Sequence, residues 1–399
     1  TCALPIWPNA DFDLLKIFRM VPQKWLRGGF EHTMLVPSGT QRFVLWERLL
    51  AFLAGEGTLT PSARPAQVTG RRLTCDLLVI GAGPEGIVAA NEAARAGRRV
   101  ILVTRGQQPA RFATAMQTAL PSREPAIEIF TGHEACAVYR SGRLVLAAPL
   151  DGGPALAIEN SELILATGKR SMPPLVCGNT LPGVMDAQTG LSLAAGSAKA
   201  MGRVVVVGTG QRDLVTERLR ALGVEIAASV AVADLQMIKG RTRVDSVDIG
   251  RNVSCDTVIH AGPWRSDPNL VFQSMSEGTL RLTAQALGEH VRIVGSAGDP
   301  DENIVWSGDA HADVCPCMDV TAGEISDLVH AGVHHVEEIK RQTSAGMGPC
   351  QGFPCWELMS AVVAASGVTA VDRPSHRPPR RAMTVAQAAG LADLVEPLR

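Results

Sequence analysis

Four cysteines near the end of the chain form two close pairs. Cys315 and Cys317 have one residue between them, and Cys350 and Cys355 have four. Four thiolates select zinc or an iron-sulfur cluster. Cysteine pairs in structural zinc sites usually leave about two to four residues between the ligands, so the single residue in the first pair favours two sulfide-bridged irons. The spacing predicts a [2Fe-2S] site, with zinc and unligated thiols as alternatives.

Glycines and two basic residues surround the second cysteine pair. Gly346, Gly348 and Gly352 would let the backbone approach a cluster and donate amide hydrogens to its sulfurs. Lys340 and Arg341 directly precede this loop. They are interpreted either as the solvated end of a helix, where cations are favoured by the helix dipole, or as a phosphate clamp for a nearby flavin.

A second set of glycines, Gly81, Gly83 and Gly86, has the spacing of a pyrophosphate-binding turn. The turn follows a short apolar run and opens an alanine-rich segment, which favours nucleotide binding over a simple tight turn. The acidic residue expected to bind the ribose after the next strand is replaced by Thr104, which Arg105 follows. The nucleotide could therefore be FAD, NAD(P) or another adenine nucleotide.

A similar turn lies further along, at Gly208 and Gly210. Its third glycine position holds Asp213, whose carboxylate would repel a pyrophosphate there. We therefore expect the two glycines to have a structural role. Two other pairs suit either the later flavin contacts of such folds or plain loops: Thr167 with Gly168, and Gly298 with Asp299.

The elements that position these residues follow from hydrophobic runs and breakers. Residues 75–103 and 203–226 each predict a strand, a glycine turn, a helix and a second strand, and the apolar runs 163–168, 256–260 and 291–294 predict further buried strands. The predicted fold class is α/β, with two dinucleotide-binding units as in disulfide reductases, followed by a small helical domain. In that domain Thr321 and Glu324 predict a capping box.

The predicted domain boundaries are as follows. Residues 1–6 resemble a translated sequencing adapter, 7–72 form a lead-in with one helix at 43–54, and 73–310 form the nucleotide-binding domain with the second unit nested at about 170–262. Residues 311–371 form the cysteine domain. Residues 372–399 form a proline-rich tail whose basic segment 373–381 is expected to be extended rather than packed, unless it wraps a neighbour.

Composition limits the possible partners. The formal net charge is -1 and 46% of the residues are apolar, so a buried core is expected and no electrostatic footprint for nucleic acid is present. No apolar run reaches the length of a membrane span, and we expect a cytoplasmic protein. Cys75, Cys136, Cys177 and Cys255 stand singly in apolar surroundings and are expected to be buried, inert thiols.

Taken together, these motifs resemble the alpha subunits of heterotetrameric sarcosine oxidase, of proline, hydroxyproline and opine dehydrogenases, and of hydrogen cyanide synthase. The resemblance rests on segments 81–86, 165–168, 207–210 and 317–321, on Arg377-Pro-Pro-Arg-Arg and, most specifically, on the glycine-cysteine loop 340–352. In the cysteine region it is similar to bacterioferritin-associated ferredoxin (BFD). The four retained cysteines imply a dehydrogenase rather than an oxidase.

The resemblance implies an electron-transfer subunit of a flavin-dependent amine or imino-acid dehydrogenase. An amino-acid-oxidase-like beta subunit would oxidise the substrate on its own FAD, an FMN would lie near the subunit boundary, and a quinone or a small redox protein would accept the electrons. Two alternatives stay open. One is a self-contained NAD(P)H-dependent ferredoxin-type reductase, and the other is a non-catalytic iron-sulfur scaffold.

Overall fold

The chain divides into two compact units, Thr1–Pro65 and Ala66–Arg399. The computed structural model describes residues 68–267, 269–273, 288–348, 350–368, 371, 379–381, 383–392 and 394. The predicted adapter residues, the lead-in helix 43–54 and the start of the tail at 372–378 lie outside the described residues. The fold below is that of the second unit.

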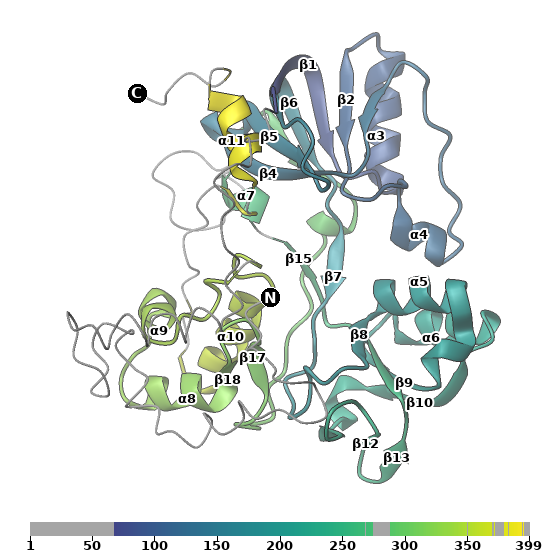
Figure 1. The fold of residues 1–399 in the computed structure, drawn as a ribbon, viewed down its shortest axis with the longest axis vertical. Coiled ribbons are helices and arrows are strands. Elements are labelled where there is room, and N and C mark those ends of the chain that lie inside the picture. The colour runs from purple at the N-terminus through teal and green to yellow at the C-terminus, as the bar shows by residue number, and fades with distance from the viewer. Residues whose placement is uncertain are drawn as a thin grey trace, which may run out of the picture. The chain divides into compact units, whose positions relative to one another are not determined.

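The first sheet carries the first glycine turn and has seven strands. In spatial order they are β3 (Glu128–Phe130), β2 (Val100–Val103), β1 (Arg71–Ile80), β6 (Leu156–Leu165), β5 (Leu144–Pro149) and β4 (His133–Tyr139), with β16 (Val291–Ile293) also paired with β6. Strands β3, β2, β1, β6 and β16 are parallel, whereas β5 and β4 are antiparallel. Helix α3 (Pro84–Arg95) crosses from β1 to β2 (Figure 1).

Local sequence explains this first crossover. The last four residues of β1 are all buried, as in a parallel strand covered on both faces. Pro84 stands at the start of α3, where its missing N–H costs nothing, and Gly97 follows the helix with φ +75°. The predicted strand, turn, helix and strand are confirmed.

The second sheet forms the nested unit. Its parallel strands are β10 (Glu225–Ala231), β9 (Arg203–Gly208), β14 (Thr257–Ala261) and β8 (Val184–Asp186), and its helices are α5 (Ala187–Ser197) and α6 (Arg212–Ala221). A small antiparallel sheet of β11 (Met237–Lys239), β12 (Ser246–Asp248) and β13 (Asn252–Ser254) adjoins it. The two-strand ribbon of β7 (Lys169–Ser171) and β15 (Trp264–Ser266) runs between the two large sheets (Figure 1).

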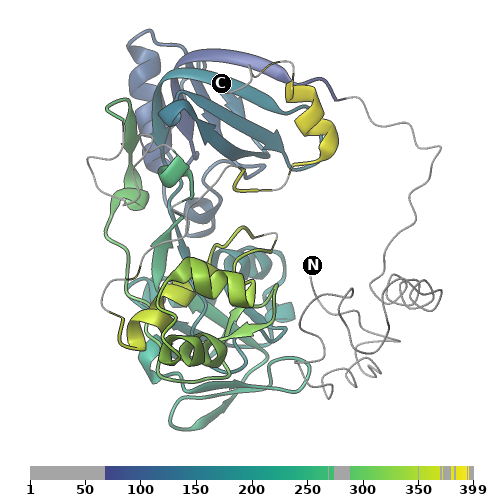
Figure 2. The same ribbon diagram turned by 90° about the vertical axis from the view of Figure 1, so that its left-hand side faces the viewer.

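The cysteine domain is helical, as predicted. It contains the hairpin β17 (Asp313–Cys315) and β18 (Val320–Thr321) and the helices α8 (Ala322–His330), α9 (Val336–Thr343) and α10 (Cys355–Ala365), which gather in Figure 2. The predicted capping box is present, since Glu324 N–H donates to Thr321 Oγ1 at 3.4 Å and the Thr321 N–H donates to the Glu324 carboxylate at 3.1 Å. The predicted fold class is therefore confirmed.

The described part of the tail is packed against the first sheet. Helix α11 (Val385–Ala392) buries Leu391, and the Gln387 amide donates to the carbonyl oxygens of Pro149 and Gly153 at 3.1 and 3.0 Å. The expectation of an unpacked basic segment is wrong at Arg380, which enters buried ion pairs. Composition alone could not reveal these partners, because they lie more than 100 residues away in the chain.

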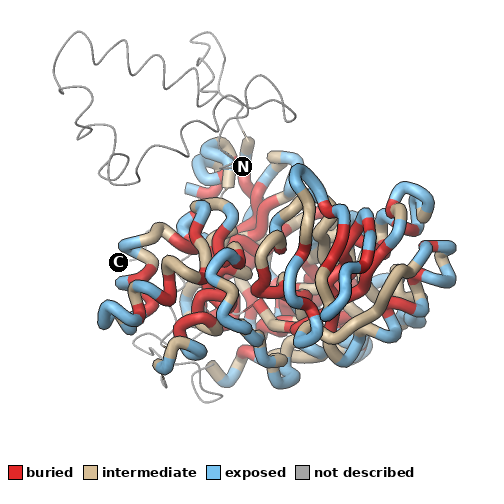
Figure 3. The backbone as a smooth tube through the Cα atoms, turned by 90° about the horizontal axis from the view of Figure 1, so that it is seen from below, coloured by how far each residue is buried: buried red, intermediate tan, exposed pale blue. Residues whose placement is uncertain are grey.

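Three short helical segments and four 3₁₀ turns complete the described elements. They are α4 (Arg111–Ala115), α7 (Asn269–Gln273), η3 (Arg140–Gly142), η4 (Ala198–Met201), η5 (Val232–Asp234) and η6 (Gly295–Gly298), together with α11 above. Figure 3 shows the buried residues gathered in the interior and the exposed residues around the outside. Among the described residues, no helix has both the length and the apolar character needed to cross a membrane.

Candidate functional site

A cavity of about 1370 Å³ lies at the carboxyl ends of the parallel strands of the first sheet. Strands β1, β2 and β6 are in register at Ile80, Val103 and Leu165, so the segments that follow them emerge side by side. Ligands of open α/β sheets bind at this edge. The volume exceeds the roughly 300–1,000 Å³ of a typical small-molecule site, which suits a ligand as long as a dinucleotide.

The three glycines of the first turn have different tasks. Gly81 has φ +106°, and a Cβ there would lie 2.2 Å from the Ala166 carbonyl oxygen; a Cβ on Gly86 would lie 2.2 Å from the Gly81 carbonyl oxygen. Both are required by close packing. A Cβ on Gly83 would meet no such neighbour within 4 Å, although Gly83 lines the cavity. The turn therefore leaves space for a pyrophosphate beside the N-terminus of α3.

The end of β2 has a cationic character. Thr104 lines the cavity and Arg105 follows it, exposed. The nearby carboxylate is Glu134 of β4, whose preceding residue donates its N–H to the Thr104 carbonyl oxygen at 3.1 Å. Glu134 is paired with Arg380 at 3.4 Å and also with Arg381. The Glu134 carboxylate is thus paired with arginines of the tail. It does not replace the acidic residue that usually binds the ribose after β2.

The other expected flavin contacts differ in whether they line the cavity. Thr167–Gly168 follow β6 and line the cavity. Gly298–Asp299 are exposed and do not line it; Gly295 and Ser296, at the start of the same 3₁₀ turn, form that part of the wall. The apolar run of β16 located the strand, but the conformation of the turn after it decides which of its residues reach the cavity.

The cavity wall also contains charged residues that the sequence did not single out as a site. Arg380 pairs with Asp267 as well as with Glu134, and Lys169 and Arg170 follow Gly168 into the ribbon. The residues come from β4, β7, the segment before α7, and the tail. Their separation in the chain left no local signal, although Arg380 belongs to the basic segment used for the family resemblance.

The four cysteines of the predicted metal site come together. Cys315 ends β17, Cys317 follows in the turn, Cys350 lies in the loop after α9, and Cys355 begins α10. The Sγ atoms of Cys350 and Cys355 are 3.7 Å apart, and the Gly346 N–H donates to Cys315 Sγ at 3.3 Å. Cys315 and Cys355 are buried, whereas Cys317 and Cys350 are half-buried.

Two of the four thiols, those of Cys315 and Cys350, have lowered pKa values. The hydrogen bond with Cys355, helped by backbone amides, lowers the pKa of Cys315 to about 6. The same partner lowers the pKa of Cys350 to about 6, and Cys350 also bonds with Cys317. Donation to both partners raises the pKa of Cys355 in turn. Because thiolates are the form that binds metal, this environment favours ligation near neutral pH.

The donor set fits a [2Fe-2S] cluster. Four thiols stand in contact with one another, and a backbone amide points at one sulfur, as is usual around such clusters. A Cβ on Gly348 would lie 2.6 Å from the Cβ of Cys317, so only glycine fits beside this ligand. Within the described residues, no group of three or more His, Cys, Asp or Glu side chains is arranged to hold a single metal ion. The fit to a [2Fe-2S] cluster therefore depends on the two cysteine pairs and their mutual contacts.

The remaining described cysteines lie outside this site. Burial raises the pKa of Cys75 to about 12 and that of Cys136 and Cys255 to about 11. These three are buried as predicted. Cys177 is only half-buried, although burial also raises its pKa. Thiols with raised pKa values are poor ligands and nucleophiles.

Lys340 and Arg341 lie in the last turn of α9, and neither lines the cavity. The Lys340 ammonium lies 5.4 Å from the centre of the Trp356 ring and 3.5 Å from the Glu337 carboxylate. Arg341 is exposed. These positions suit the end of a helix, and they leave both side chains at the surface of the cysteine domain.

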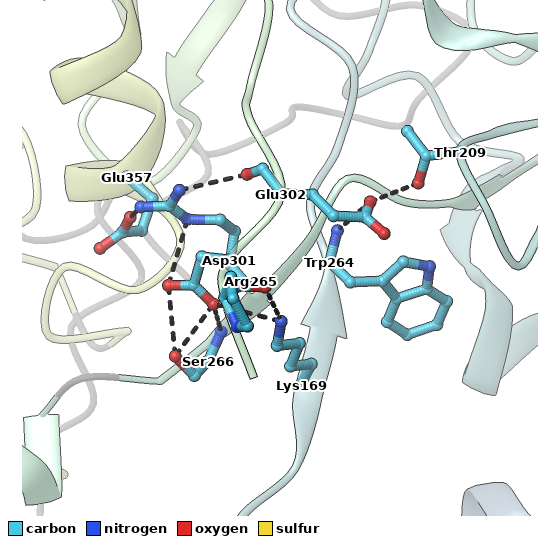
Figure 4. A network of polar contacts seen from close by, with 9 residues as sticks. Lys169, Thr209, Trp264, Arg265, Ser266, Asp301, Glu302 and Glu357 are labelled. Atoms are coloured by element: carbon cyan, nitrogen blue, oxygen red, sulfur yellow. Dashed lines mark hydrogen bonds and ion pairs between the residues drawn. The ribbon is translucent and has the colours of Figure 1, made fainter. Parts of the chain in front are cut away.

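A polar network fixes the cysteine domain to the nucleotide-binding domain (Figure 4). Arg265 of β15 pairs with Glu357 in the first turn of α10, and lies 3.7 Å from Asp301. It also donates to the Glu302 carbonyl oxygen at 3.1 Å, while the Glu302 carboxylate accepts from Thr209. Arg265 therefore links the start of α10, where Cys355 lies, to Glu302. Glu302 in turn contacts Thr209 of the second nucleotide unit.

The two predicted sites share one cavity. Cys350 and Phe353 of the cysteine loop line the same space as Gly83, and the guanidinium of Arg170 lies 5.5 Å from the centre of the Phe353 ring. Of the four candidate cluster ligands, Cys350 is the one in the cavity wall. A ligand on the glycine turn and a cluster on the cysteines would thus be neighbours.

The second glycine turn does not contribute glycines to this cavity. A Cβ on Gly208 would lie 2.3 Å from the Ala261 carbonyl oxygen, so this glycine permits close strand packing. Gly210 and Asp213 are absent from the cavity lining, and the Asp213 carboxylate pairs with Arg212 at 2.8 Å. These contacts agree with the structural role expected for this turn.

Comparisons with known proteins agree with this division. A family model of pyridine nucleotide-disulphide oxidoreductases matches residues 75–212, and one of BFD-like [2Fe-2S] binding domains matches residues 314–365. A crystal structure of L-proline dehydrogenase from P. horikoshii covers 79% of the chain and is itself covered to 80%, with a TM-score of 0.67 and 21% identity. The chain is an oxidoreductase-type protein that combines a disulfide-reductase-like nucleotide fold with a BFD-like [2Fe-2S] domain.

Among curated proteins, the sarcosine oxidase alpha subunit of Rhizobium meliloti is 30% identical over 256 residues, which is 56% of this chain and 25% of the relative. The opine oxidase A subunit of Agrobacterium tumefaciens is 32% identical over 162 residues, or 34% of this chain and 32% of the relative. The resemblance to these subunits that the motifs predicted is confirmed. The matches span about a quarter to a third of the relatives' own length.

Proposed function

We propose that this chain is the electron-transfer subunit of a heteromeric flavin-dependent dehydrogenase that acts on the C–N bond of a secondary amine or imino acid. A partner flavoprotein subunit would oxidise the substrate, and this chain would carry the electrons to an acceptor. The relatives are named as individual subunits of a sarcosine oxidase and of an opine oxidase, and these names support both the substrate class and the existence of partner subunits.

The observation that carries this proposal is the shared cavity. Cys350, a ligand of the cysteine site, lines the same cavity as Gly83 of the pyrophosphate turn. A one-electron centre and a nucleotide cofactor placed on one cavity form the simplest arrangement for relaying electrons. The proposal assigns substrate oxidation to the partner subunit.

The proposed contacts are those that the motifs predicted, and the cavity lining supports part of them. Gly81, Gly83 and Gly86 would hold the pyrophosphate of FAD, NAD(P) or another adenine nucleotide, with Thr104 near its ribose. Thr167, Gly168, Gly298 and Asp299 stay proposed as flavin contacts, of which the first two line the cavity. Cys315, Cys317, Cys350 and Cys355 would hold the cluster, which supplies one-electron chemistry.

Lys340 and Arg341 are proposed as contacts for the phosphate of an FMN at the boundary with the partner. Their place in the last turn of α9, outside the cavity, supports a ligand bound at the surface rather than on the glycine turn. The partner is proposed to be an amino-acid-oxidase-like beta subunit, with a quinone or a small redox protein as the acceptor. The free thiols of the described cysteines support a reducing, cytoplasmic location.

Reconstitution tests this function. The full chain is purified alone and together with an amino-acid-oxidase-like flavoprotein, and dye reduction is measured with sarcosine, proline and opines. We expect activity in the complex and none in the isolated chain. In a complex carrying Cys350→Ala, the partner's flavin should still bleach with substrate while transfer to the dye fails. Substrate-dependent dye reduction by the isolated chain contradicts the subunit role.

One observation favours a second candidate, an NAD(P)H-dependent ferredoxin-type reductase. Thr104 and Arg105 occupy the position where NAD-binding proteins usually have an acidic residue, which would repel a 2′-phosphate. An arginine at this place suits NADP instead. In that case NADPH alone should drive dye reduction by the isolated chain. The same purified protein distinguishes the two functions.

A further inference from the structure

Arg170 occupies an unusual place between the two sites. It lies on β7, lines the cavity that contains the glycine turn, and places its guanidinium 5.5 Å from the centre of the Phe353 ring in the cysteine loop. Phe353 is buried and lies between the ligands Cys350 and Cys355. Arg170 is thus in contact with the cavity on one side and with the cysteine loop on the other.

The charge of Arg170 is not compensated by a direct ion pair. Within the part of the chain that the structure describes, no ion pair joins it to Asp or Glu. The carboxylates of this region, Glu134 and Asp267, are instead paired with Arg380 and Arg381 of the tail. Burial, with Arg105 and Arg380 nearby, lowers the pKa of Arg170, while the Asp267 and Glu134 carboxylates, which are paired elsewhere, act in the opposite direction. A half-buried cation that faces a cavity needs an anionic partner.

The two exposed arginines that line the cavity do not need an anionic partner in the same way, because water solvates their charge. Arg105 and Arg111 are exposed to water, and Lys169 lies 3.7 Å from the Asp301 carboxylate. Among the described cations that line the cavity, Arg170 is therefore the one that is partly buried and forms no ion pair. An anionic group of a ligand in the cavity would supply a direct partner for it.

We propose that Arg170 binds a negatively charged group of the nucleotide in this cavity and, through Phe353, couples occupancy of the cavity to the cysteine loop. The inference rests on the proposed function, because it requires both a nucleotide and a cluster. Beyond that function, it assigns to Arg170 a contact with the nucleotide and a contact with the cysteine loop. Guanidinium groups pair strongly with phosphate and stack on aromatic rings, so one side chain can serve both contacts.

Coupling of this kind is reciprocal. If binding of the nucleotide alters the surroundings of Cys350, the state of the cysteine site alters the affinity for the nucleotide by the same factor. Removal of the charge should weaken nucleotide binding and remove the coupling. Removal of the aromatic ring alone should leave the affinity largely intact and remove the coupling.

The test uses the full chain purified with its cluster, and FAD, NADP⁺ and ADP as probes that share a diphosphate but differ in the remainder of the ligand. Dissociation constants are measured by calorimetry for the parent, Arg170→Gln, Arg170→Lys and Phe353→Leu, with the exposed Arg251→Gln as a matched control. The visible circular dichroism and the electron paramagnetic resonance of the reduced cluster are recorded with and without each probe.

We expect at least one probe to bind the parent and to change the cluster spectrum. Arg170→Gln should weaken that probe by at least about tenfold and abolish the spectral change, because it removes a charge-assisted hydrogen bond. Arg170→Lys should recover most of the affinity. Phe353→Leu should bind as the parent does and show no spectral change, and Arg251→Gln should match the parent in both measurements.

Two results overturn the inference while the proposed function stands. One is a dissociation constant for Arg170→Gln equal to that of the parent. The other is a parent cluster whose spectrum is unchanged by a saturating probe. A parent that contains no cluster, or binds none of the probes, overturns the proposed function as well, and this result is visible before any variant is made. Thermal unfolding of each variant shows that the fold is retained.

Discussion

The two glycine-rich segments of the molecule, 81–86 and 346–352, are similar in composition but differ in what surrounds them. A Cβ on Gly83 would meet open space in the cavity. A Cβ on Gly346 or Gly352 would lie 2.0 or 2.2 Å from atoms of the Trp356 ring. Gly83 leaves room for a ligand, whereas Gly346 and Gly352 make room for the protein's own tryptophan.

This difference changes what a substitution should do. Where the space is open, a larger residue should block a ligand without disturbing the fold. Where the space is filled, it should disturb the fold first and the cofactor only as a consequence. Glycine spacing in a sequence cannot tell these situations apart, since the neighbour that fills the space belongs to another element.

The largest effect should come from a ligand in the cysteine loop itself. We expect the parent, purified without oxygen, to contain iron and acid-labile sulfide in equal amounts, about two of each per chain. Cys350→Ala leaves three thiolates and should lose essentially all of both. Metal and sulfide analysis measures this, and Cys177→Ala, a half-buried thiol outside the site, is the control. Stoichiometric zinc without sulfide in the parent, or full iron in Cys350→Ala, contradicts the assignment.

The next effect tests the filled glycine. Gly352 has φ +87°, and an added methyl group would collide with Trp356. Gly352→Ala should therefore lower the free energy of unfolding of the cysteine domain by about 3 kcal/mol, through backbone strain and overpacking together. Denaturant unfolding followed by tryptophan fluorescence measures it.

Gly367 offers the matched control for this substitution. It has φ +100°, but a Cβ there would meet nothing within 4 Å. Gly367→Ala should cost about 1 kcal/mol, since it adds strain without a collision. Equal losses in the two variants would show that Trp356 does not fill the space beside Gly352.

A third test addresses the open glycine. Gly83→Val should weaken nucleotide binding by about 100-fold, because the side chain occupies space that the pyrophosphate needs, while unfolding stays within about 1 kcal/mol of the parent. Gly210→Val in the second unit is the control, since its Cβ also meets nothing within 4 Å but lies outside the cavity lining. A Gly83→Val protein that keeps its nucleotide removes this glycine from the site.

Local patterns predicted more of this molecule than distant ones. The strand and turn before Gly86, and the capping box at Thr321, depend on residues that are neighbours in the chain, so composition and spacing were sufficient. The cysteine site was also predictable, because thiol chemistry restricts its use. Arg170 and Arg380 could not be located in advance, since their places depend on packing between β7, the tail and the first sheet.

The smallest effect concerns a buried histidine of the second nucleotide unit, where polar groups serve the fold. His260 of β14 is buried, and its Nδ1 lies 2.7 Å from the Ser171 hydroxyl. Burial lowers its pKa to about 4, although the Asp186 carboxylate acts in the opposite direction. The unfolded chain, with a histidine pKa of about 6.5, binds more protons between these values. Stability should therefore fall as pH falls from about 6.5 towards 4.

Between pH 7.5 and 5.5 this histidine should account for a loss of roughly 1 kcal/mol in the free energy of unfolding. His260→Asn keeps a polar atom near Ser171 but cannot titrate, so its stability should depend less steeply on pH, whatever its absolute value. The exposed His311→Asn is the control and should keep the slope of the parent. Denaturant unfolding at several pH values measures the slopes. If His260→Asn and the parent lose stability equally over this range, the buried imidazole is not the group that titrates, and the second unit owes its pH dependence to other residues.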